Sequence, residues 1–161
     1  MARPKIIVFD LDYTLWPFWV DTHVDPPFKK GKDGKITDSR GSVIKCYPQV
    51  PEVLKKLHEE GFELGIASRT SEIRGANQLV QLFGWDKYFK YKEIFPGSKT
   101  THFRNIKQQS KVEYKDMIFF DDEQRNISDL TKVGVLSILV RDGVTKKLVE
   151  DSISKFEREY Q

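Results

Sequence analysis

The sequence predicts a three-layer α/β fold, in which a central parallel sheet is covered by helices on both faces. Short apolar runs alternate with amphipathic segments from one end of the chain to the other. Most positions within the runs are apolar, so both faces of each strand are expected to be buried, as in parallel sheets. Strands that alternate with helices imply crossover connections within one sheet. At 161 residues the chain is expected to form a single domain, residues 1–161.

The individual strands and helices follow from these two patterns. Strands are predicted at 6–9, 64–67, 117–120 and 136–140, where the apolar runs lie. Helices are predicted at 50–60, 71–83, 100–109, 126–133 and 145–159, where apolar residues recur at helical spacing. Three of these helices run up to a glycine, at Gly61, Gly84 and Gly134, which is typical of a helix end.

The stretch from 16 to 49 departs from this alternation. It contains four prolines and three glycines and lacks helical periodicity. Segments 36–37 and 43–46, on either side of Ser39-Arg40-Gly41, predict a small hairpin. We interpret residues 16–49 as a flap beside the strand ends. About 35 residues separate positions 15 and 50, and about 30 separate 68 and 99, so no large cap domain is expected.

The amino-acid composition indicates the compartment and the partners to expect for the protein. The net charge of +3 is small and charges of both signs are interspersed, which is typical of an ordinary surface and not of a nucleic-acid footprint. The lone cysteine, Cys46, excludes an internal disulfide and indicates a reducing compartment. No apolar run approaches the length of a membrane span or a secretory signal. We therefore expect a cytoplasmic monomer, with a nuclear share left open, and neither nucleic acid nor a membrane as partner.

Polar side chains follow the predicted strands, where ligands of open α/β sheets bind. They are Asp10 and Asp12 after 6–9, Ser68 after 64–67, Lys99 at the start of the helix at 100–109, and Asp121 with Asp122 after 117–120. Each one alone has an ordinary explanation, because aspartate and serine are common in turns and helix caps and most lysines are solvated. Together they are expected to converge on one edge of the sheet.

This set of residue types suits phosphate chemistry. Carboxylates at neighbouring strand ends can hold Mg²⁺, which commonly bridges to a substrate phosphate and offsets its repulsion with an anionic nucleophile. Asp10 could attack phosphorus, while Ser68 and Lys99 bind the phosphoryl oxygens. Asp12 would protonate the leaving oxygen and then deprotonate the attacking water. That role needs a neutral carboxyl at the start, so burial and neighbouring carboxylates are expected to raise the pKa of Asp12.

The same residues resemble the motifs of the haloacid dehalogenase (HAD) superfamily of phosphatases. Asp10-x-Asp12-x-Thr14 resembles its first motif, Ser68 its second, Lys99 its third and Asp121-Asp122 its fourth, in the correct order and without a departure. From Val8 to Asp142 the chain is most similar to the eukaryotic magnesium-dependent phosphatases, through FDLDYTLWP, ASRT, PGSK and FFDDE. The resemblance implies a Rossmann-like HAD fold and magnesium-dependent phosphomonoester hydrolysis through an aspartyl phosphate on Asp10.

The resemblance also implies individual roles and substrates. Asp12 would be the general acid and base, and the metal would bind the carboxylates of Asp10 and Asp122 and the main-chain carbonyl of Asp12. Asp121 would then support the site from behind, although the order of the adjacent pair stays open. Relatives act on phosphotyrosine-like groups and on phosphorylated sugar adducts of proteins, such as fructosamine phosphates. An uncapped site favours large substrates of this kind.

Three further residues are expected at the substrate: Leu11, Trp19 and Arg69. Arginine suits bidentate recognition of phosphate, although a surface ion pair is the ordinary role of such a residue. Trp19 would face the substrate as in close relatives, whereas Trp16 and Phe18 are expected to pack the flap onto the core. The three histidines show no zinc-ligand spacing and are interpreted as structural or solvated.

Two other functions stay open at this point. One is a module that binds phosphate and metal without turnover, although no expected catalytic group is missing from the sequence. The other is a phosphotransferase that uses the same intermediate, although the missing cap argues against an enzyme that must exclude water. A zinc hydrolase or nucleotide-binding protein is not indicated, because the sequence has no His/Cys cluster, Walker A sequence or glycine-rich dinucleotide fingerprint.

Overall fold

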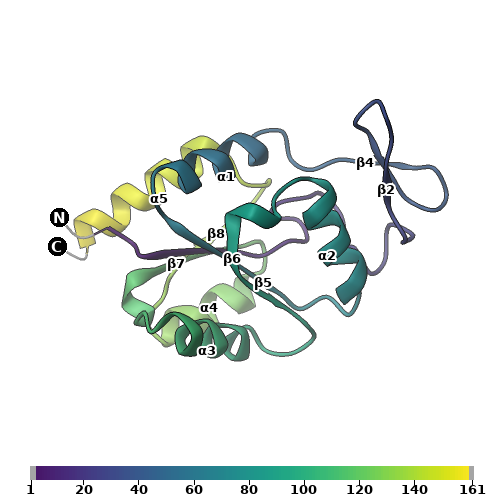
Figure 1. Cartoon of the computed structure of the whole chain (residues 1–161). Helices are drawn as coiled ribbons and strands as arrows, with labels where there is room; N and C mark the ends of the chain where they lie inside the picture. The colour runs from purple at the N-terminus through teal and green to yellow at the C-terminus, as the bar shows by residue number, and fades with distance from the viewer. Residues whose placement is uncertain (1–2, 160–161) are drawn as a thin grey trace.

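A computed structural model describes residues 3–159, and its centre is a five-stranded parallel sheet (Figure 1). The strand order is β6-β5-β1-β7-β8, and every neighbouring pair is parallel. The strands are β1 (Ile6–Phe9), β5 (Glu63–Ser68), β6 (Phe89–Ile94), β7 (Met117–Asp121) and β8 (Leu136–Leu139). The predicted α/β class is confirmed, and four of these strands were predicted from their apolar runs.

The fifth strand, β6, was not predicted. It lies at one edge of the sheet, and its sequence FKYKEI alternates between buried and exposed positions. An edge strand that exposes one face carries polar residues at every second position, so it lacks the continuous apolar run of a central strand.

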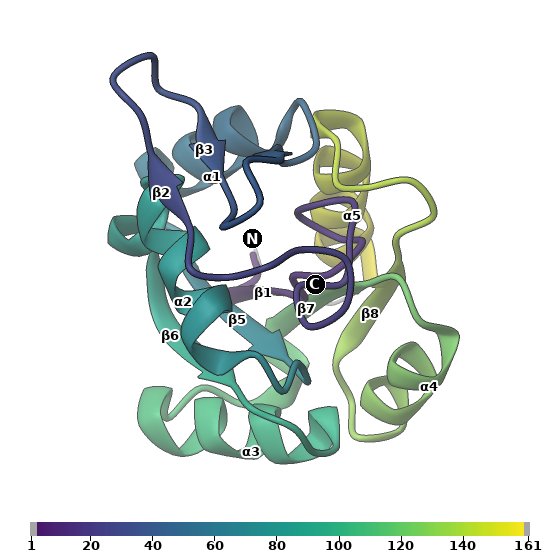
Figure 2. The ribbon, with the colours of Figure 1, turned by 90° about the vertical axis from the view of Figure 1, so that its right-hand side faces the viewer.

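Helices cover both faces of the sheet, as expected. They are α1 (Val50–Glu59), α2 (Ile73–Leu82), α3 (Lys99–Ser110), α4 (Gln124–Lys132) and α5 (Lys146–Glu159), and two short 3₁₀ helices lie at Asp86–Tyr88 and Tyr114–Asp116. Helices α1, α2 and α5 contribute to one core, and α3 and α4 contribute to the other (Figure 2). Successive side chains of β1 alternate between them: Ile7 and Phe9 belong to the first core, and Ile6 and Val8 to the second.

The flap contains a small antiparallel sheet, which lies at the carboxyl-terminal edge of the main sheet (Figures 1 and 2). Its strands are β2 (Lys29–Lys30), β3 (Ile36–Thr37) and β4 (Val43–Ile44). The predicted hairpin corresponds to β3 and β4, whereas β2 was not predicted because its two lysines carry no apolar signal. Phe28, Ile36 and Ile44 are buried in the first core and hold this small sheet to the body.

The part of the chain that the structure describes contains no helix long and apolar enough to cross a membrane.

Candidate active site

The site is built where β1 ends between its two neighbours. Phe9 pairs with Ile66 of β5 and with Phe120 of β7, so the next residue along β1 lies beside the ends of both. That residue is Asp10, whose N–H donates to the carbonyl of Phe120 at 3.0 Å. Main-chain hydrogen bonds on both sides therefore fix the position of the Asp10 carboxyl group.

A tight turn after β1 places Asp12 near Asp10. The carbonyl of Leu11 accepts hydrogen bonds from the N–H groups of Thr14, Leu15 and Trp16 at 2.9–3.3 Å. Leu11 is fully buried. The hydroxyl of Thr14 donates to Oδ2 of Asp10 at 3.3 Å, which orients the carboxyl group.

Lys99 is buried at the start of α3 and joins three strands. Its Nζ donates to Oδ1 of Asp10 at 2.9 Å, to Oδ2 of Asp121 at 2.8 Å and to the carbonyl of Ala67 at 2.7 Å. The side chain is 1% exposed, so all three ammonium protons are used inside the protein. The ordinary interpretation of Lys99 as a solvated lysine therefore does not apply.

The two adjacent aspartates at the end of β7 differ in their surroundings. Asp121 is fully buried, and its carboxyl accepts from Lys99, from the Nδ2 of Asn126 at 3.0 Å and from the N–H of Glu123 at 2.8 Å. Its oxygens are thus occupied by protein donors. Asp122 is only partly buried and borders the cavity described below.

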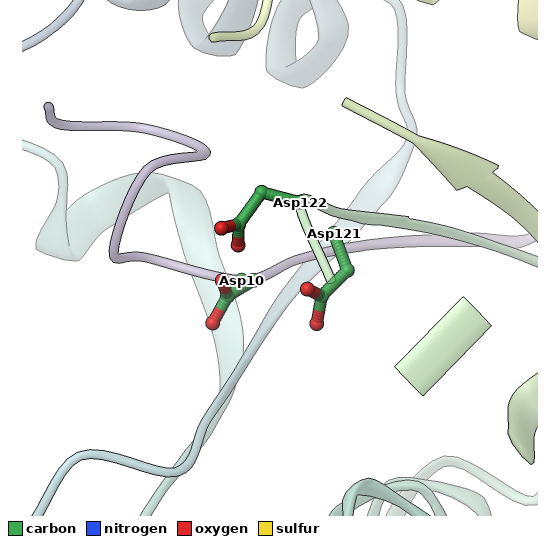
Figure 3. A group of neighbouring side chains, drawn as sticks. All are labelled: Asp10, Asp121 and Asp122. Atoms are coloured by element: carbon green, nitrogen blue, oxygen red, sulfur yellow. The ribbon is translucent and has the colours of Figure 1, made fainter. Parts of the chain in front are cut away.

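Oxygen atoms of Asp10, Asp121 and Asp122 lie within 4.8 Å of one another (Figure 3). Burial, together with the charges of Asp121 and Asp122, raises the pKa of Asp10 well above its usual value, although Lys99 opposes the shift. Burial, followed by the charge of Asp121, raises the pKa of Asp122 to about 6. The single positive charge of Lys99 does not neutralise the three carboxylates. The cluster therefore fits a hard divalent cation, because such an ion prefers oxygen ligands and supplies the missing positive charge.

Asp12 has a raised pKa of about 6, in the expected direction. Burial is the main cause, and the charge of Asp21 adds to it. Hydrogen bonds from Nε1 of Trp16 at 2.8 Å and from the N–H of Val20 at 3.1 Å oppose the shift. Both of these bonds end on Oδ1, so the other oxygen of Asp12 is the one placed to carry a proton.

Ser68 lies at the end of β5 and is 1% exposed. Its Oγ accepts from the N–H of Thr70 at 3.3 Å. It does not cap the following helix, because the side chain of Glu72 accepts from the N–H of Gly75 and performs that role for α2. A capping role for Ser68 at α2 is thus excluded. Like Asp10 and Lys99, Ser68 lies at the carboxyl-terminal edge of the main sheet.

A cavity of about 330 Å³ opens above these residues. Six of the predicted site residues border it, namely Asp10, Asp12, Trp19, Arg69, Lys99 and Asp122. Leu11 and Ser68 lie beneath it and do not contribute to its wall. Trp19 is 47% exposed and stacks on His23, whose Nδ1 accepts from the N–H of Trp19 at 2.9 Å.

Several residues of the cavity wall were not predicted from the sequence, among them Thr70, Arg125 and Asn126. The last two lie in the first turn of α4, within one helical turn of Asp122. Their signal was their position just after the fourth motif, at the start of a predicted helix. Arg69 and Arg125 both reach this cavity, so its wall carries positive as well as negative charge.

Trp16 and Phe18 pack as expected. Both are buried, and their rings stack with centroids 5.4 Å apart. His102 is also buried, and its two ring nitrogens lie 2.9 Å and 2.8 Å from the carbonyls of Ser98 and Phe95. It is a structural residue that holds the loop leading into Lys99.

Comparison with known proteins supports the resemblance seen in the motifs. Residues 2–159 match the model of the family described as Acid Phosphatase. The chain is 54% identical to the human protein Magnesium-dependent phosphatase 1 over 157 residues, which cover 97% of this chain and 89% of that protein. It is 40% identical to a HAD-like hydrolase superfamily protein of Schizosaccharomyces pombe, covering 82% of this chain and 83% of the other. A solved HAD-superfamily hydrolase from Ehrlichia chaffeensis superimposes with a TM-score of 0.67 at 13% identity over 100% of both chains, which supports the fold.

Proposed function

The chain belongs to the Acid Phosphatase family of HAD-like hydrolases, and from this we propose that it hydrolyses phosphomonoesters with magnesium, through a phosphoryl group carried on Asp10. One observation carries this proposal. The buried Nζ of Lys99 joins Asp10 to Asp121, while the Asp122 carboxyl stands beside Asp10 at the cavity. The proposed nucleophile Asp10, the positive charge of Lys99 and the accessible carboxylate of Asp122 thus lie next to one another.

The metal would be held by the carboxylates of Asp10 and Asp122 and by the main-chain carbonyl of Asp12. Asp121 is less suited to direct ligation, because its oxygens already accept hydrogen bonds from three protein donors. When bound, Mg²⁺ supplies the positive charge that lets an anionic phosphate approach an anionic carboxylate. Asp121 instead positions Lys99.

In the first half of the reaction, a carboxylate oxygen of Asp10 forms a bond to phosphorus as the bond to the leaving oxygen breaks. Asp12 gives its proton to that leaving oxygen. Lys99 stabilises the negative charge on the transferring group, and the hydroxyl of Ser68 hydrogen-bonds a phosphoryl oxygen. In the second half, Asp12 takes a proton from water, and the water oxygen attacks phosphorus. Inorganic phosphate leaves and the Asp10 carboxylate is restored.

The pKa of Asp12, about 6, supports this exchange of roles. A group that titrates near the working pH is both a competent acid and a competent base. Burial and the fixed hydrogen bonds to Oδ1 hold the carboxyl in one orientation, with its second oxygen available for the proton.

We further propose that the substrates are phosphates displayed on proteins, either phosphotyrosine or phosphorylated sugar adducts. The exposed ring of Trp19 at the cavity offers a surface for an aromatic or sugar ring. Arg69 at the same wall suits a further phosphate or main-chain contact. We also propose that the chain acts as a monomer, since its exposed large apolar side chains are dispersed over Trp19, Val43, Ile73 and Val133.

The direct test is hydrolysis of an aryl phosphate by purified protein with and without Mg²⁺. We expect turnover that EDTA abolishes and excess Mg²⁺ restores, and that Asp10→Asn eliminates. Asp151→Asn is the matched control, because Asp151 is an exposed residue of α5 paired only with Lys147 among the contacts described. Folded, magnesium-loaded protein that releases no phosphate would favour the binding module. Transfer of phosphate to an added alcohol in preference to water would favour a phosphotransferase.

A further inference from the structure

The segment from 28 to 46, which contains the small sheet of the flap, is strongly basic. It holds six basic and two acidic residues, a net charge of +4, against +3 for the whole chain. Its two carboxylates are turned to the backbone of the flap: Asp33 accepts from the N–H of Lys35, and Asp38 accepts from three main-chain N–H groups. Neither carboxylate forms an ion pair with a described lysine of the segment, and a net charge of +4 remains.

The lysines of the segment also have no ion pair with any of residues 3–159. Arg40 pairs with Asp25 at 3.0 Å, but the structure shows no ion pair for the other five basic residues, which are Lys29, Lys30, Lys32, Lys35 and Lys45. Elsewhere on the described surface, seven of the thirteen lysines have an acidic partner, namely Lys5, Lys56, Lys90, Lys92, Lys107, Lys146 and Lys147. The contrast marks the flap as a surface with unpaired positive charge.

The strand register places part of this charge on one face. Lys29 pairs with Thr37, which pairs with Val43, so these three side chains lie on the same side of the small sheet. The opposite side holds Ile36 and Ile44, which are buried in the first core, together with the exposed Lys30. Alternation along the strands adds Lys35 and Lys45 to the outer side. We call these five residues, Lys29, Lys35, Thr37, Val43 and Lys45, the basic face.

The segment that leads from the active site into the basic face borders two hollows in turn. Asp21 and Thr22 border the active-site cavity, and Pro26 and Pro27, a few residues later, border a groove of about 700 Å³ against α2. The chain then enters the small sheet, which lies at the same edge of the main sheet as the site (Figure 2). The flap therefore lies at the edge of the main sheet from which a peptide would bring its phosphate to the cavity.

We propose that the basic face binds an acidic segment of the phosphoprotein substrate, next to the residue that carries the phosphate. This deepens the proposed function and rests on it. Lysine ammonium groups on flexible stems around the exposed Val43 suit separate carboxylates on a peptide. A nucleic acid is a poorer fit, because the basic face has no aromatic side chain on which bases could stack.

The test measures the affinity of the protein for labelled phosphotyrosyl peptides. One peptide carries several glutamates before the phosphotyrosine, and a second carries them after it. A peptide with glutamine at the same positions is the reference. The protein is the full chain with Asp10→Asn, so that the phosphate is not removed. We expect the better acidic peptide to bind about three- to tenfold more tightly than the reference at low salt. Salt of about 0.5 M should remove most of this difference.

The flap variant replaces three lysines, Lys29→Gln, Lys35→Gln and Lys45→Gln, and should bind acidic and reference peptides equally. The matched control is Lys55→Gln, Lys115→Gln and Lys132→Gln, which removes the same charge at exposed positions without a described ion pair. With intact Asp10, the flap variant should keep the aryl phosphate activity of the wild type and raise KM for the acidic peptide alone.

Several outcomes would overturn the proposal. Equal binding of acidic and reference peptides by the wild type would mean that the lysines only protect the edges of a short sheet from pairing. An equal loss of affinity for the acidic peptide in the flap variant and in the control would indicate a general effect of net charge. Tighter binding of a single-stranded oligonucleotide through the same three lysines would assign the face to nucleic acid. Failure of aryl phosphate hydrolysis would instead refute the proposed function, whereas the binding comparison can fail while hydrolysis is normal.

Discussion

Replacing Lys99 with methionine would remove the only buried cation described at the site while keeping a side chain of similar length. Lys99 forms ion pairs with Asp10 at 2.9 Å and with Asp121 at 2.8 Å, and all three side chains are at least 90% buried. Removing one partner of a buried pair typically costs about 3–5 kcal/mol, because a buried charge is left uncompensated. We expect Lys99→Met to lower the free energy of unfolding by about this amount near neutral pH without metal.

The loss should depend on pH in a defined direction. The charge of Lys99 lowers the pKa of Asp10, so in the variant that pKa rises further above its value in the unfolded chain. A carboxyl whose pKa is raised on folding stabilises the protein at low pH, and this contribution is lost as pH rises through the folded-state value. The difference between variant and wild type should therefore grow as pH rises from the folded-state pKa of Asp10 in the wild type, which is already raised, to the higher value in the variant.

Urea denaturation in EDTA at several pH values measures this difference. Lys107→Met is the matched control, because Lys107 pairs with Glu113 at 3.2 Å on the surface, where the two side chains are 42% and 60% exposed. The loss of unfolding free energy in Lys107→Met should stay below about 1 kcal/mol. The reasoning would be wrong if Lys99→Met cost no more than the control, or if its cost were the same at every pH. Activity should fall by about 10²–10³ in Lys99→Met, because the positive charge beside the transferring phosphoryl group is lost.

Three other predictions concern the same site. The turnover of substrates with poor leaving groups should decline as pH rises above about 6, because Asp12 must be protonated to act as the acid; a kcat profile that stays flat well above neutral pH would contradict this role. Mg²⁺ at a hundred times its dissociation constant should stabilise the protein by about 2.7 kcal/mol in thermal unfolding. This stabilisation should be smaller at pH values where Asp10 and Asp122 are protonated, and Asp122→Asn should remove most of it. Trp16→Ala should cost about 3–5 kcal/mol of stability, whereas Trp19→Ala should leave stability nearly unchanged and raise KM for aryl phosphates; equal stability losses would show that Trp19 is a packing residue.

Much of the fold could be predicted because its central strands are buried on both sides. β1, β5 and β7 consist almost entirely of buried positions, so their sequences are nearly continuous apolar runs. β2 and β6 expose one or both faces, and their polar residues resemble those of a loop. Such strands are defined by pairing with a neighbour, which a local pattern does not record.

The site residues were predicted from their positions after strands, but the order of the adjacent pair Asp121 and Asp122 stayed open. Which of Asp121 and Asp122 contacts Lys99 depends on where β7 ends, and a shift of one residue would exchange the two side chains between its faces. The structure includes Asp121 in β7 and leaves Asp122 just beyond it. Asn126, which donates to Asp121, could not be identified from spacing alone, because the contact needs the first turn of α4 to fold back over the strand end.

The position of β1 in the middle of the sheet has a consequence for how this protein can change over evolutionary time. The proposed nucleophile, Asp10, directly follows the strand that has neighbours on both sides, whereas the flap lies between that strand and α1 in the chain. Insertions or charge changes in the flap can therefore accumulate without disturbing the register that aligns the reacting atoms. New targets can be acquired at the periphery while the chemistry at the centre is inherited unaltered.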